Sequence, residues 1–242
     1  MSDRVAILGT PFDRLDLRAA VARILERFDD GRRTFVITAN PEFVMIARRD
    51  TEVARLAHEA ELVVADGTGV ALGARILGDP LARVPGRVLV DALIPELARR
   101  EASVFLLGAA PGVAERAAAV LRRREPGLRV AGAYAGDAGD DVDTAARVRA
   151  SAPDVLFVAF GMPKQERWIA RNLASLPSVR LVIGVGGVFD QLAGLRRVPP
   201  AFLYRVGLEW LWRLAMEPSR WRRQRVLPIF ALLVLRQRLV GR

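Results

Sequence analysis

The stretch VLFVAFGMPKQERWIARNLASLPSVRLVIGV, residues 155–185, contains the pattern that decides the fold. Two short apolar runs, residues 155–160 and 180–185, flank a helical stretch at residues 164–175. Apart from Arg180, which begins the second run, each run is apolar at consecutive and not only at alternate positions. This pattern is typical of a strand buried on both faces. The stretch therefore predicts a strand–helix–strand unit of a parallel sheet.

The same alternation runs through most of the chain. Further strands are predicted at residues 5–8, 34–38, 62–65, 103–107 and 128–132, and further helices at residues 17–29, 41–59, 69–77, 90–100, 111–124 and 143–151. We therefore expect a Rossmann-like α/β fold with a mostly parallel sheet flanked by helices. The strand signal stops near residues 194–200, which divides the chain into an α/β core, residues 1–195, and a helical appendage, residues 196–242.

The composition fits a folded protein and excludes some chemistry. The 242 residues are 52% hydrophobic, with a mean hydropathy of +0.20, so extensive disorder is not expected. The chain has no cysteine, which excludes disulfides, Cys-ligated zinc and thiolate catalysis. The opening MSDRVAILGTPFDRLDLR has no long apolar run and no secretory signal, so we expect a cytoplasmic protein.

The net charge of +10 is concentrated in the appendage, where eleven Arg accompany two Glu. Such a segment suits an anionic surface, either nucleic acid or acidic lipid, although a solvated helical face is the alternative. Its apolar run VLPIFALLVL, residues 226–235, is flanked by Arg. Ten helical residues reach about 15 Å, and a bilayer core is about 30 Å thick. We therefore expect the appendage to dock on the inner face of the plasma membrane without crossing it; packing on the core or on another subunit is the alternative.

Polar side chains follow the second and third strands of the predicted sheet. Thr38 and Asn40 come directly after one strand, and Asp66 comes directly after the next. Ligands of open parallel sheets bind beyond the carboxyl ends of the strands, where a carboxylate can act as a general base. Asn40 and Asp66 also suit the N-caps of the helices that follow. The residues alone leave both interpretations open.

Glycine-rich turns follow later strands. Gly108 ends the fourth strand before a helix N-terminus that could meet phosphate oxygens. Gly184, Gly186 and Gly187 follow the seventh strand, and they let a ligand approach the backbone closely. Asp190 lies where it could accept hydrogen bonds from a ribose or a base. An NAD fingerprint is the competing interpretation, but the third glycine is missing and the strand is late in the chain.

The helix after the sixth strand begins with Lys164, the single Lys of the chain, and Gln165. Cations in the first turn of a helix oppose the helix dipole. A bound anion would offset the charges of Lys164 and Arg167, so we expect Lys164 and Gln165 to contribute to a donor site.

No metal site is expected. His58 is the only histidine, and Asp141-Val142-Asp143 forms a DxD sequence in an acidic stretch that suits helix capping and solvation better than metal binding.

The blocks TANPEF, ADGTGV, RVPG, LLG, GDAGD, FGMPKQERW, GVGGVFDQLAG, GLEWLWRL and EPSRWRRQ occur in that order. In this combination the chain resembles the WecG–TagA–CpsF family of bacterial glycosyltransferases. The resemblance implies an inverting transfer from a UDP-sugar, typically UDP-N-acetylmannosamine or its uronic acid. The implied acceptor is N-acetylglucosamine on undecaprenyl diphosphate, in surface polysaccharide or teichoic acid synthesis.

The resemblance also implies roles for single residues. The family's catalytic base falls on Asp66, its cleft Thr and Asn on Thr38 and Asn40, and its cleft Arg on Arg83; Gln165 and Asp190 match further cleft positions. Arg83 would stabilise the departing diphosphate. From the appendage, Arg213, Arg220 and Arg223 could close over the UDP diphosphate, so that no metal cofactor is required.

The chain departs from the family pattern in two cleft blocks. Where the family often has G-S/T-D-L, residues 86–89 are GRVL, and where it often has RAP, residues 196–200 are RRVPP. The first departure keeps another donor hexose, such as glucose, as an alternative. The expected partners are a UDP-sugar, a lipid-linked acceptor and an anionic membrane surface, and not nucleic acid; self-association is left open.

Overall fold

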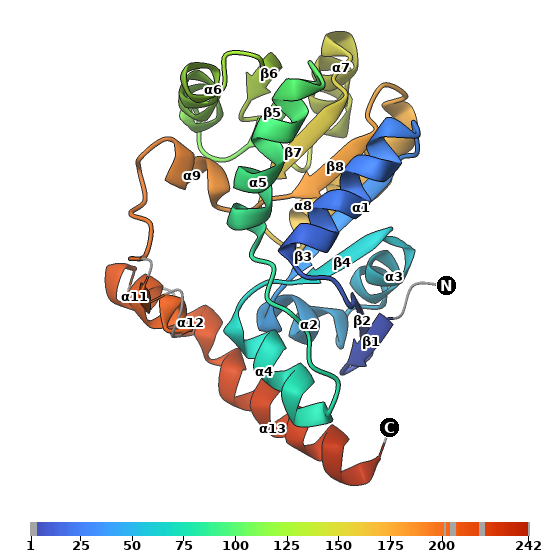
Figure 1. Cartoon of the computed structure of the whole chain (residues 1–242), viewed down its shortest axis with the longest axis vertical. Coiled ribbons are helices and arrows are strands. Elements are labelled where there is room, and N and C mark those ends of the chain that lie inside the picture. Colours follow the sequence, from blue (N-terminus) through green and yellow to red (C-terminus); the bar gives the residue numbers. More distant parts are fainter. Residues whose placement is uncertain (1–3, 201, 204–206, 218–220, 242) are drawn as a thin grey trace.

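A computed structural model describes residues 4–200, 202–203, 207–217 and 221–241. In this part of the chain six parallel strands form the central sheet, in the spatial order β4-β3-β8-β7-β5-β6 (Figure 1). The strands are β3 (Thr34–Ala39), β4 (Leu62–Ala65), β5 (Ser103–Gly108), β6 (Arg129–Tyr134), β7 (Val155–Ala159) and β8 (Leu181–Gly184). The predicted α/β fold with a parallel sheet is confirmed.

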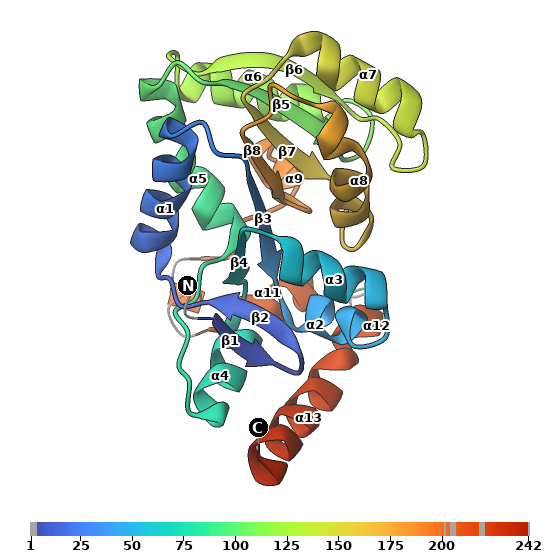
Figure 2. The same cartoon turned by 90° about the vertical axis from the view of Figure 1, so that its right-hand side faces the viewer.

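Helices cover both faces of the sheet (Figure 2). One face carries α1 (Leu17–Asp29), α5 (Gly86–Arg99), α6 (Val113–Arg124) and α9 (Val188–Leu192). The other carries α2 (Pro41–Ala47), α3 (Thr51–Glu59), α4 (Thr68–Leu77), α7 (Asp141–Ser151) and α8 (Lys164–Asn172), which a 3₁₀ turn, η1 (Leu173–Ser175), extends. Alternate residues of β7 enter opposite cores: Val155 and Phe157 face one, Leu156 and Val158 the other. Burial on both faces explains why the inner strands are mostly apolar, whereas the edge strand β6 is partly exposed and begins with Arg129.

The N-terminal strand corrects one expectation. β1 (Arg4–Ile7) pairs antiparallel with β2 (Thr10–Asp13) in a separate two-stranded sheet, and β2 was not predicted. The turn residues Leu8 and Gly9 both have positive φ, 50° and 87°, as a two-residue hairpin turn requires.

The predicted helix at residues 41–59 is in fact two helices, α2 and α3. Asp50 lies between them, and its Oδ1 accepts a hydrogen bond of 3.1 Å from the Val53 amide. This carboxylate is therefore the N-cap of a new helix, which the apolar periodicity alone did not distinguish from a continuous one.

The appendage contains α11 (Glu209–Met216), α12 (Trp221–Gln224) and α13 (Val226–Val240). α13 lies along α4 and also packs against α2 (Figures 1 and 2). Its Phe230 and Val234 are buried in the core shared with those helices. Pro228 does not interrupt α13, because it lies in the first turn, where a helix tolerates proline. One face of the appendage therefore packs on the core, which was the alternative to docking on a membrane.

The opposite face of α13 is exposed and apolar, at Ile229, Leu232, Leu235 and Leu239. Docking on a membrane stays a prediction for this face, as does the domain boundary at residue 195. Within the described residues, no helix is both long enough and apolar enough to cross a bilayer. The 15 residues of α13 would span about 22 Å at 1.5 Å per residue.

Candidate active site

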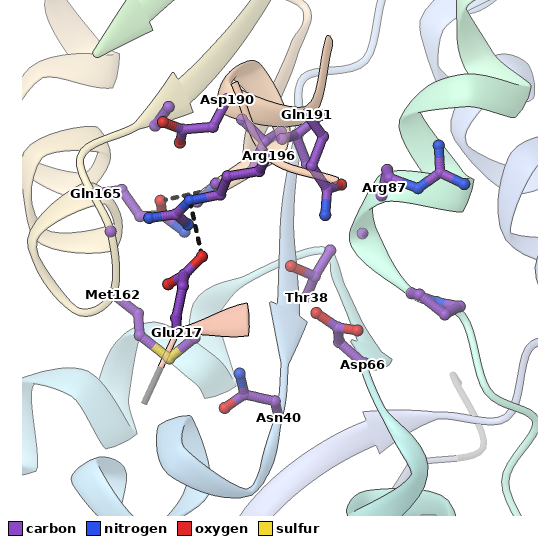
Figure 3. Close-up of a pocket in the computed structure, with 18 of the residues that line it drawn as sticks. Thr38, Asn40, Asp66, Arg87, Met162, Gln165, Asp190, Gln191, Arg196 and Glu217 are labelled. Atoms are coloured by element: carbon purple, nitrogen blue, oxygen red, sulfur yellow. Dashed lines mark hydrogen bonds and ion pairs between the residues drawn. The ribbon is translucent and has the colours of Figure 1, made fainter. Parts of the chain in front are cut away.

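A cavity of about 540 Å³ opens where four neighbouring strands end (Figure 3). Its lining includes the residues that end or follow β3, β4, β7 and β8, which are adjacent in the sheet. The carboxyl ends of parallel strands are where sheets of this type bind ligands. The cavity is therefore the first candidate for the active site.

Three side chains form what we call the floor of the cavity: Thr38, Asn40 and Asp66 (Figure 3). The Thr38 hydroxyl donates to the Gly184 carbonyl at 3.3 Å, which joins β3 to β8. The Asn40 Oδ1 accepts from the Phe43 amide at 3.0 Å, so Asn40 caps α2 while it lines the cavity. The cap and cleft interpretations of Asn40 therefore both hold.

Asp66 extends the pairing of β3 and β4 by one residue, since its amide donates to the Ala39 carbonyl at 2.9 Å. The N-cap of the next helix, α4, is Gly67, and no side chain caps it. Asp66 is thus not used as the N-cap residue, which was the alternative to a cleft role. It is only partly buried, and its carboxylate lies in the cavity lining next to Thr38 (Figure 3).

Gln165 forms a side wall and is held in one orientation. Its Oε1 accepts from the Gly186 amide at 3.1 Å, and its Nε2 donates to Glu166 Oε1 at 2.9 Å. A side chain at Gly184 would collide with the Gln165 amide, so this close approach requires glycine. Gly184 thus supports the wall, while Gly186, Gly187 and Asp190 line the cavity themselves.

Glu166 is buried behind Gln165, and burial raises the pKa of its carboxyl to about 7, against the smaller lowering effect of the Gln165 hydrogen bond. Its Oε2 has no hydrogen-bond partner among the described residues. With a pKa of about 7, the Glu166 carboxyl beside the Gln165 amide changes its protonation state around neutral pH.

The appendage supplies what we call the outer wall, which contains Arg196, Glu217, Arg223 and Trp212. Arg196 Nε lies 3.1 Å from Glu217 Oε1, and Figure 3 shows this pair reaching across the cavity. Arg223 Nε donates to Glu42 Oε1 at 2.8 Å. The Trp212 indole N–H is buried with no hydrogen-bond partner in the part of the chain that is described. The wall thus offers two guanidinium groups and an unused donor beside the floor.

Sequence reasoning missed several lining residues, notably Arg87, Met162, Gln191, Arg196 and Glu217. Arg87 reaches the rim, although its Nη1 pairs with Asp91 at 2.6 Å, one turn further along α5. A signal for Glu217 existed, because the strongly basic appendage has only two acidic residues. Glu217 pairs with Arg196, and the other, Glu209, lies 3.5 Å from Arg83.

Besides Gly184, three of the predicted site residues that the structure describes are not part of the cavity lining: Arg83, Gly108 and Lys164. Arg83 donates to the Thr68 hydroxyl at 3.2 Å and faces Glu209, so it joins the loop before α5 to α11. Gly108 ends β5, where a Cβ would lie 2.7 Å from the Ala159 carbonyl carbon; glycine there allows close strand packing. Lys164 is exposed at the start of α8.

A bound anion was expected to offset the charges of Lys164 and Arg167 at the start of α8, but Arg167 does not require one. Arg167 contacts Asp50 and Glu52, the latter at 2.8 Å, so acidic residues at the start of α3 offset its charge. Of the predicted diphosphate ligands, Arg223 lines the cavity, whereas Arg220 and the side chain of Arg213 lie outside the described residues.

The two acidic residues of the DxD sequence, Asp141 and Asp143, form ion pairs with nearby arginines. Asp141 bonds Arg171 at 2.7 Å, which lowers the pKa of its carboxyl. Asp143 bonds Arg147 at 2.9 Å and the Tyr134 hydroxyl at 3.0 Å. Within the described ranges no group of three or more His, Asp or Glu side chains gathers in a way that could hold a metal ion. Independence of metal stays a prediction about the reaction.

Comparison with known proteins adds to this geometry. The sequence pattern of the glycosyl transferase WecG/TagA/CpsF family matches residues 5–242. A Staphylococcus aureus protein named N-acetylglucosaminyldiphosphoundecaprenol N-acetyl-beta-D-mannosaminyltransferase is 34% identical over 230 residues, which cover 94% of this chain and 90% of that protein. A Bacillus spizizenii protein of the same name is 33% identical over 209 residues, which cover 86% of this chain and 81% of that protein.

The chain belongs to the WecG/TagA/CpsF family of glycosyltransferases. The sequence blocks that carry this membership meet at the cavity, although they are far apart in the chain. TANPEF contributes Thr38 and Asn40, ADGTGV contributes Asp66, FGMPKQERW contributes Gln165, and GVGGVFDQLAG contributes Asp190. The WecG/TagA/CpsF blocks thus share one location in space, which is the strongest sign that the cavity is where this glycosyltransferase works.

Proposed function

We propose that this protein transfers an N-acetylmannosamine-type sugar, or its uronic acid, from a UDP-sugar to N-acetylglucosamine on undecaprenyl diphosphate. The observation that carries the proposal is the Asp66 carboxylate, which lies in the cavity lining beside Thr38 and Asn40 at the strand ends. The names of the relatives supply the sugar and the acceptor, which come to this chain as part of the proposal.

The proposed reaction inverts the anomeric carbon. Asp66 takes the proton from the acceptor hydroxyl while the hydroxyl oxygen attacks the anomeric carbon of the donor from the face opposite UDP. The new C–O bond forms as the bond to the β-phosphate oxygen of UDP breaks, and the electron pair leaves with the diphosphate. Thr38 and Asn40 orient the two sugars by hydrogen bonds, since both present polar groups to the cavity.

The outer wall suits the diphosphate of the donor. Arg196 and Arg223 bring guanidinium groups to the cavity, and such groups form strong charge-assisted hydrogen bonds with phosphate oxygens. The glycine-rich turn at Gly186 and Gly187 leaves room for the nucleotide, and Asp190 can accept from its ribose or base. Charge stabilisation by arginine and by backbone N–H groups makes a metal ion unnecessary in this proposal.

We also propose that the appendage holds the enzyme on the inner face of the plasma membrane. The exposed apolar residues Ile229, Leu232 and Leu235 share the outer face of α13 with exposed Arg225 and Arg236. Each basic side chain near an anionic leaflet contributes about 1 kcal/mol. We expect co-sedimentation with anionic vesicles at low salt, and loss of it in a Leu232→Glu/Leu235→Glu variant. A full-length protein that ignores such vesicles would refute this part of the proposal.

A second donor is favoured by one observation. In the block GRVL, Arg87, at the rim of the cavity, stands where the family often has Ser or Thr, and Val88 stands where it often has Asp. The loss of that acid and the new cation at the rim would alter hydrogen bonding to the sugar, so another hexose such as glucose is the second candidate.

A donor screen tests the whole proposal. Purified protein is incubated with a water-soluble lipid-diphosphate-N-acetylglucosamine analogue and single UDP-sugars, with and without EDTA, and the products are identified by mass spectrometry. We expect a disaccharide from UDP-N-acetylmannosamine or its uronic acid, unchanged by EDTA. Transfer of glucose alone would favour the second candidate, and an absence of transfer from every donor would overturn the function. Activity lost in EDTA and restored by manganese or magnesium would overturn the metal-free mechanism.

A further inference from the structure

A second cavity, of about 350 Å³, lies beside the first. It runs between α4 and α13 and is bounded by the starts of α2 and α11. We call it the apolar groove, because most of its walls are hydrocarbon: Pro41, Leu72, Ile76, Trp210, Val226, Leu227, Phe230, Ala231 and Val234.

The apolar groove is continuous with the candidate active site. Four residues line both cavities: Asn40, Glu42, Asp66 and Arg223. One end of the groove therefore meets a carboxylate and a guanidinium, whereas the rest of it is apolar. This polarity gradient matches an amphiphilic ligand whose polar end reacts at Asp66.

The groove remains open although its walls are apolar. Leu72 is 57% exposed and Trp210 is 41% exposed, while Phe230 and Val234 close the inner side. Glycine at position 73 allows α13 to lie close to α4, since a Cβ there would be 3.2 Å from the Phe230 ring. Large apolar side chains left exposed around a groove mark a surface that another apolar group covers.

We propose that the apolar groove binds the first isoprene units of the lipid-linked acceptor. This inference rests on the function proposed above. The sugar hydroxyl would meet Asp66, and the prenyl chain would run between Leu72 and Ala231. A volume of about 350 Å³ holds only the start of a long polyprenyl chain, so the remainder stays in the bilayer, alongside the exposed face of α13.

A pair of soluble acceptors tests the proposal without a membrane. Both carry N-acetylglucosamine diphosphate; one ends in a methyl group and the other in a short prenyl chain. We expect the wild-type KM to be at least roughly tenfold lower for the prenyl acceptor, because burial of a few carbon atoms already gives that factor. Transfer to the methyl acceptor confirms the function independently of the groove.

Two matched substitutions locate the effect. Leu72→Glu places a charge in the groove, whereas Leu232→Glu places the same charge on the exposed outer face of α13, outside both cavities. We expect Leu72→Glu to remove the prenyl advantage and to leave the KM of the methyl acceptor unchanged. Leu232→Glu should keep the prenyl advantage and weaken only vesicle binding. A prenyl advantage that survives Leu72→Glu would overturn the proposal.

A direct binding measurement adds a readout besides activity. Trp210 lines the groove, so a short prenyl diphosphate should change its fluorescence, and inorganic diphosphate should not. The change should disappear in Trp210→Phe and weaken in Ala231→Phe, which fills the groove without adding a second tryptophan. If Leu72→Glu instead shifts the protein from a dimer to a monomer and leaves the prenyl advantage intact, the groove is an interface between copies and the lipid proposal fails.

Discussion

The floor and the outer wall of the cavity are built in different ways. The floor residues end strands of a sheet that is buried on both faces, and main-chain hydrogen bonds fix them, such as that from Asp66 to Ala39 at 2.9 Å. The outer wall depends on side-chain ion pairs of partly exposed residues, Arg196 with Glu217 and Arg223 with Glu42. Exposed pairs of this kind stabilise a fold by about 0–1 kcal/mol.

The difference separates two tasks. A base must be held in place while the bond forms, so the rigid floor suits the chemical step. Guanidinium groups held by weak pairs can exchange a carboxylate for a diphosphate, so the outer wall suits binding and release of the donor. Substitutions in the floor should therefore change kcat, and substitutions in the wall should change the affinity for UDP.

The largest effect is expected for Asp66→Asn. Loss of a general base lowers kcat by roughly 10²–10⁴-fold, while the dissociation constant of UDP should stay near the wild-type value. Steady-state kinetics and calorimetric UDP titration measure the two quantities. Asp190→Asn serves as the control, because Asp190 lines the same cavity but is assigned to the nucleotide. Near-wild-type turnover by a folded Asp66→Asn protein would remove the floor from the chemistry.

Arg223→Ala should give the next largest effect. A hydrogen bond to a charged group contributes about 1.5–3 kcal/mol, so kcat/KM should fall by roughly 10–150-fold. Arg225→Ala is the matched control, since Arg225 stacks over Trp221 at 5.4 Å and is not in the cavity lining. Equal losses in the two variants would mean that the segment contributes general charge and not a specific contact.

Glu217→Gln should have a smaller effect in the opposite direction. The substitution removes the carboxylate that competes with a diphosphate for Arg196, so UDP should bind up to about fivefold more tightly. Arg196→Ala should weaken UDP binding instead. Both differences should shrink at high salt, which screens exposed charges. Weaker UDP binding by Glu217→Gln would show that the pair supports the wall in its binding conformation.

The smallest expected effect is on the stability of the fold, and it comes from Glu166, which is buried behind the side wall. Because burial raises the pKa of Glu166 from 4.5 to about 7, the folded protein binds this proton more tightly than the unfolded chain does. The tighter binding of this proton therefore adds to the free energy of unfolding. This stabilisation is fully present below about pH 4.5 and is lost as the pH rises through about 7. Glu166→Gln should lack this pH dependence. Denaturant unfolding at several pH values gives the free energy of unfolding of the wild-type and Glu166→Gln proteins. The same dependence of that free energy on pH in both proteins would contradict the prediction.

The parallel sheet could be predicted because its signal is local. Double-sided burial makes most of the strands apolar along much of their length, and β4 was predicted with its observed bounds, residues 62–65. The hairpin at the N-terminus was missed because β2 contains Pro11, and proline is unfavourable in strands. The break before α3 depends on one capping carboxylate, which helical periodicity does not reveal.

The residues of the candidate site also divide into those that the sequence predicts and those that depend on how the chain folds. Thr38, Asn40, Asp66 and Gln165 could be predicted because they lie at the carboxyl ends of strands or in the segments that follow, and parallel strands bring these ends together. The partners of the outer wall could not, because the pairing of Arg196 with Glu217 and of Arg223 with Glu42 depends on how the appendage folds back. Arg83 was assigned to the cleft by resemblance, whereas its nearest acidic partner is Glu209.

The contact between α13 and the N-terminal hairpin has a consequence for biosynthesis. Gln237 accepts from the Leu8 amide at 2.9 Å and donates to the Ala6 carbonyl at 3.2 Å, which joins segments that lie 229 and 231 residues apart in the chain. The sheet can assemble while the chain is still on the ribosome, but α13 cannot be fastened until residue 237 has emerged. A nascent chain can therefore form its strands before its cleft is enclosed, and the enzyme gains its capacity to hold substrates only after the appendage has been synthesised.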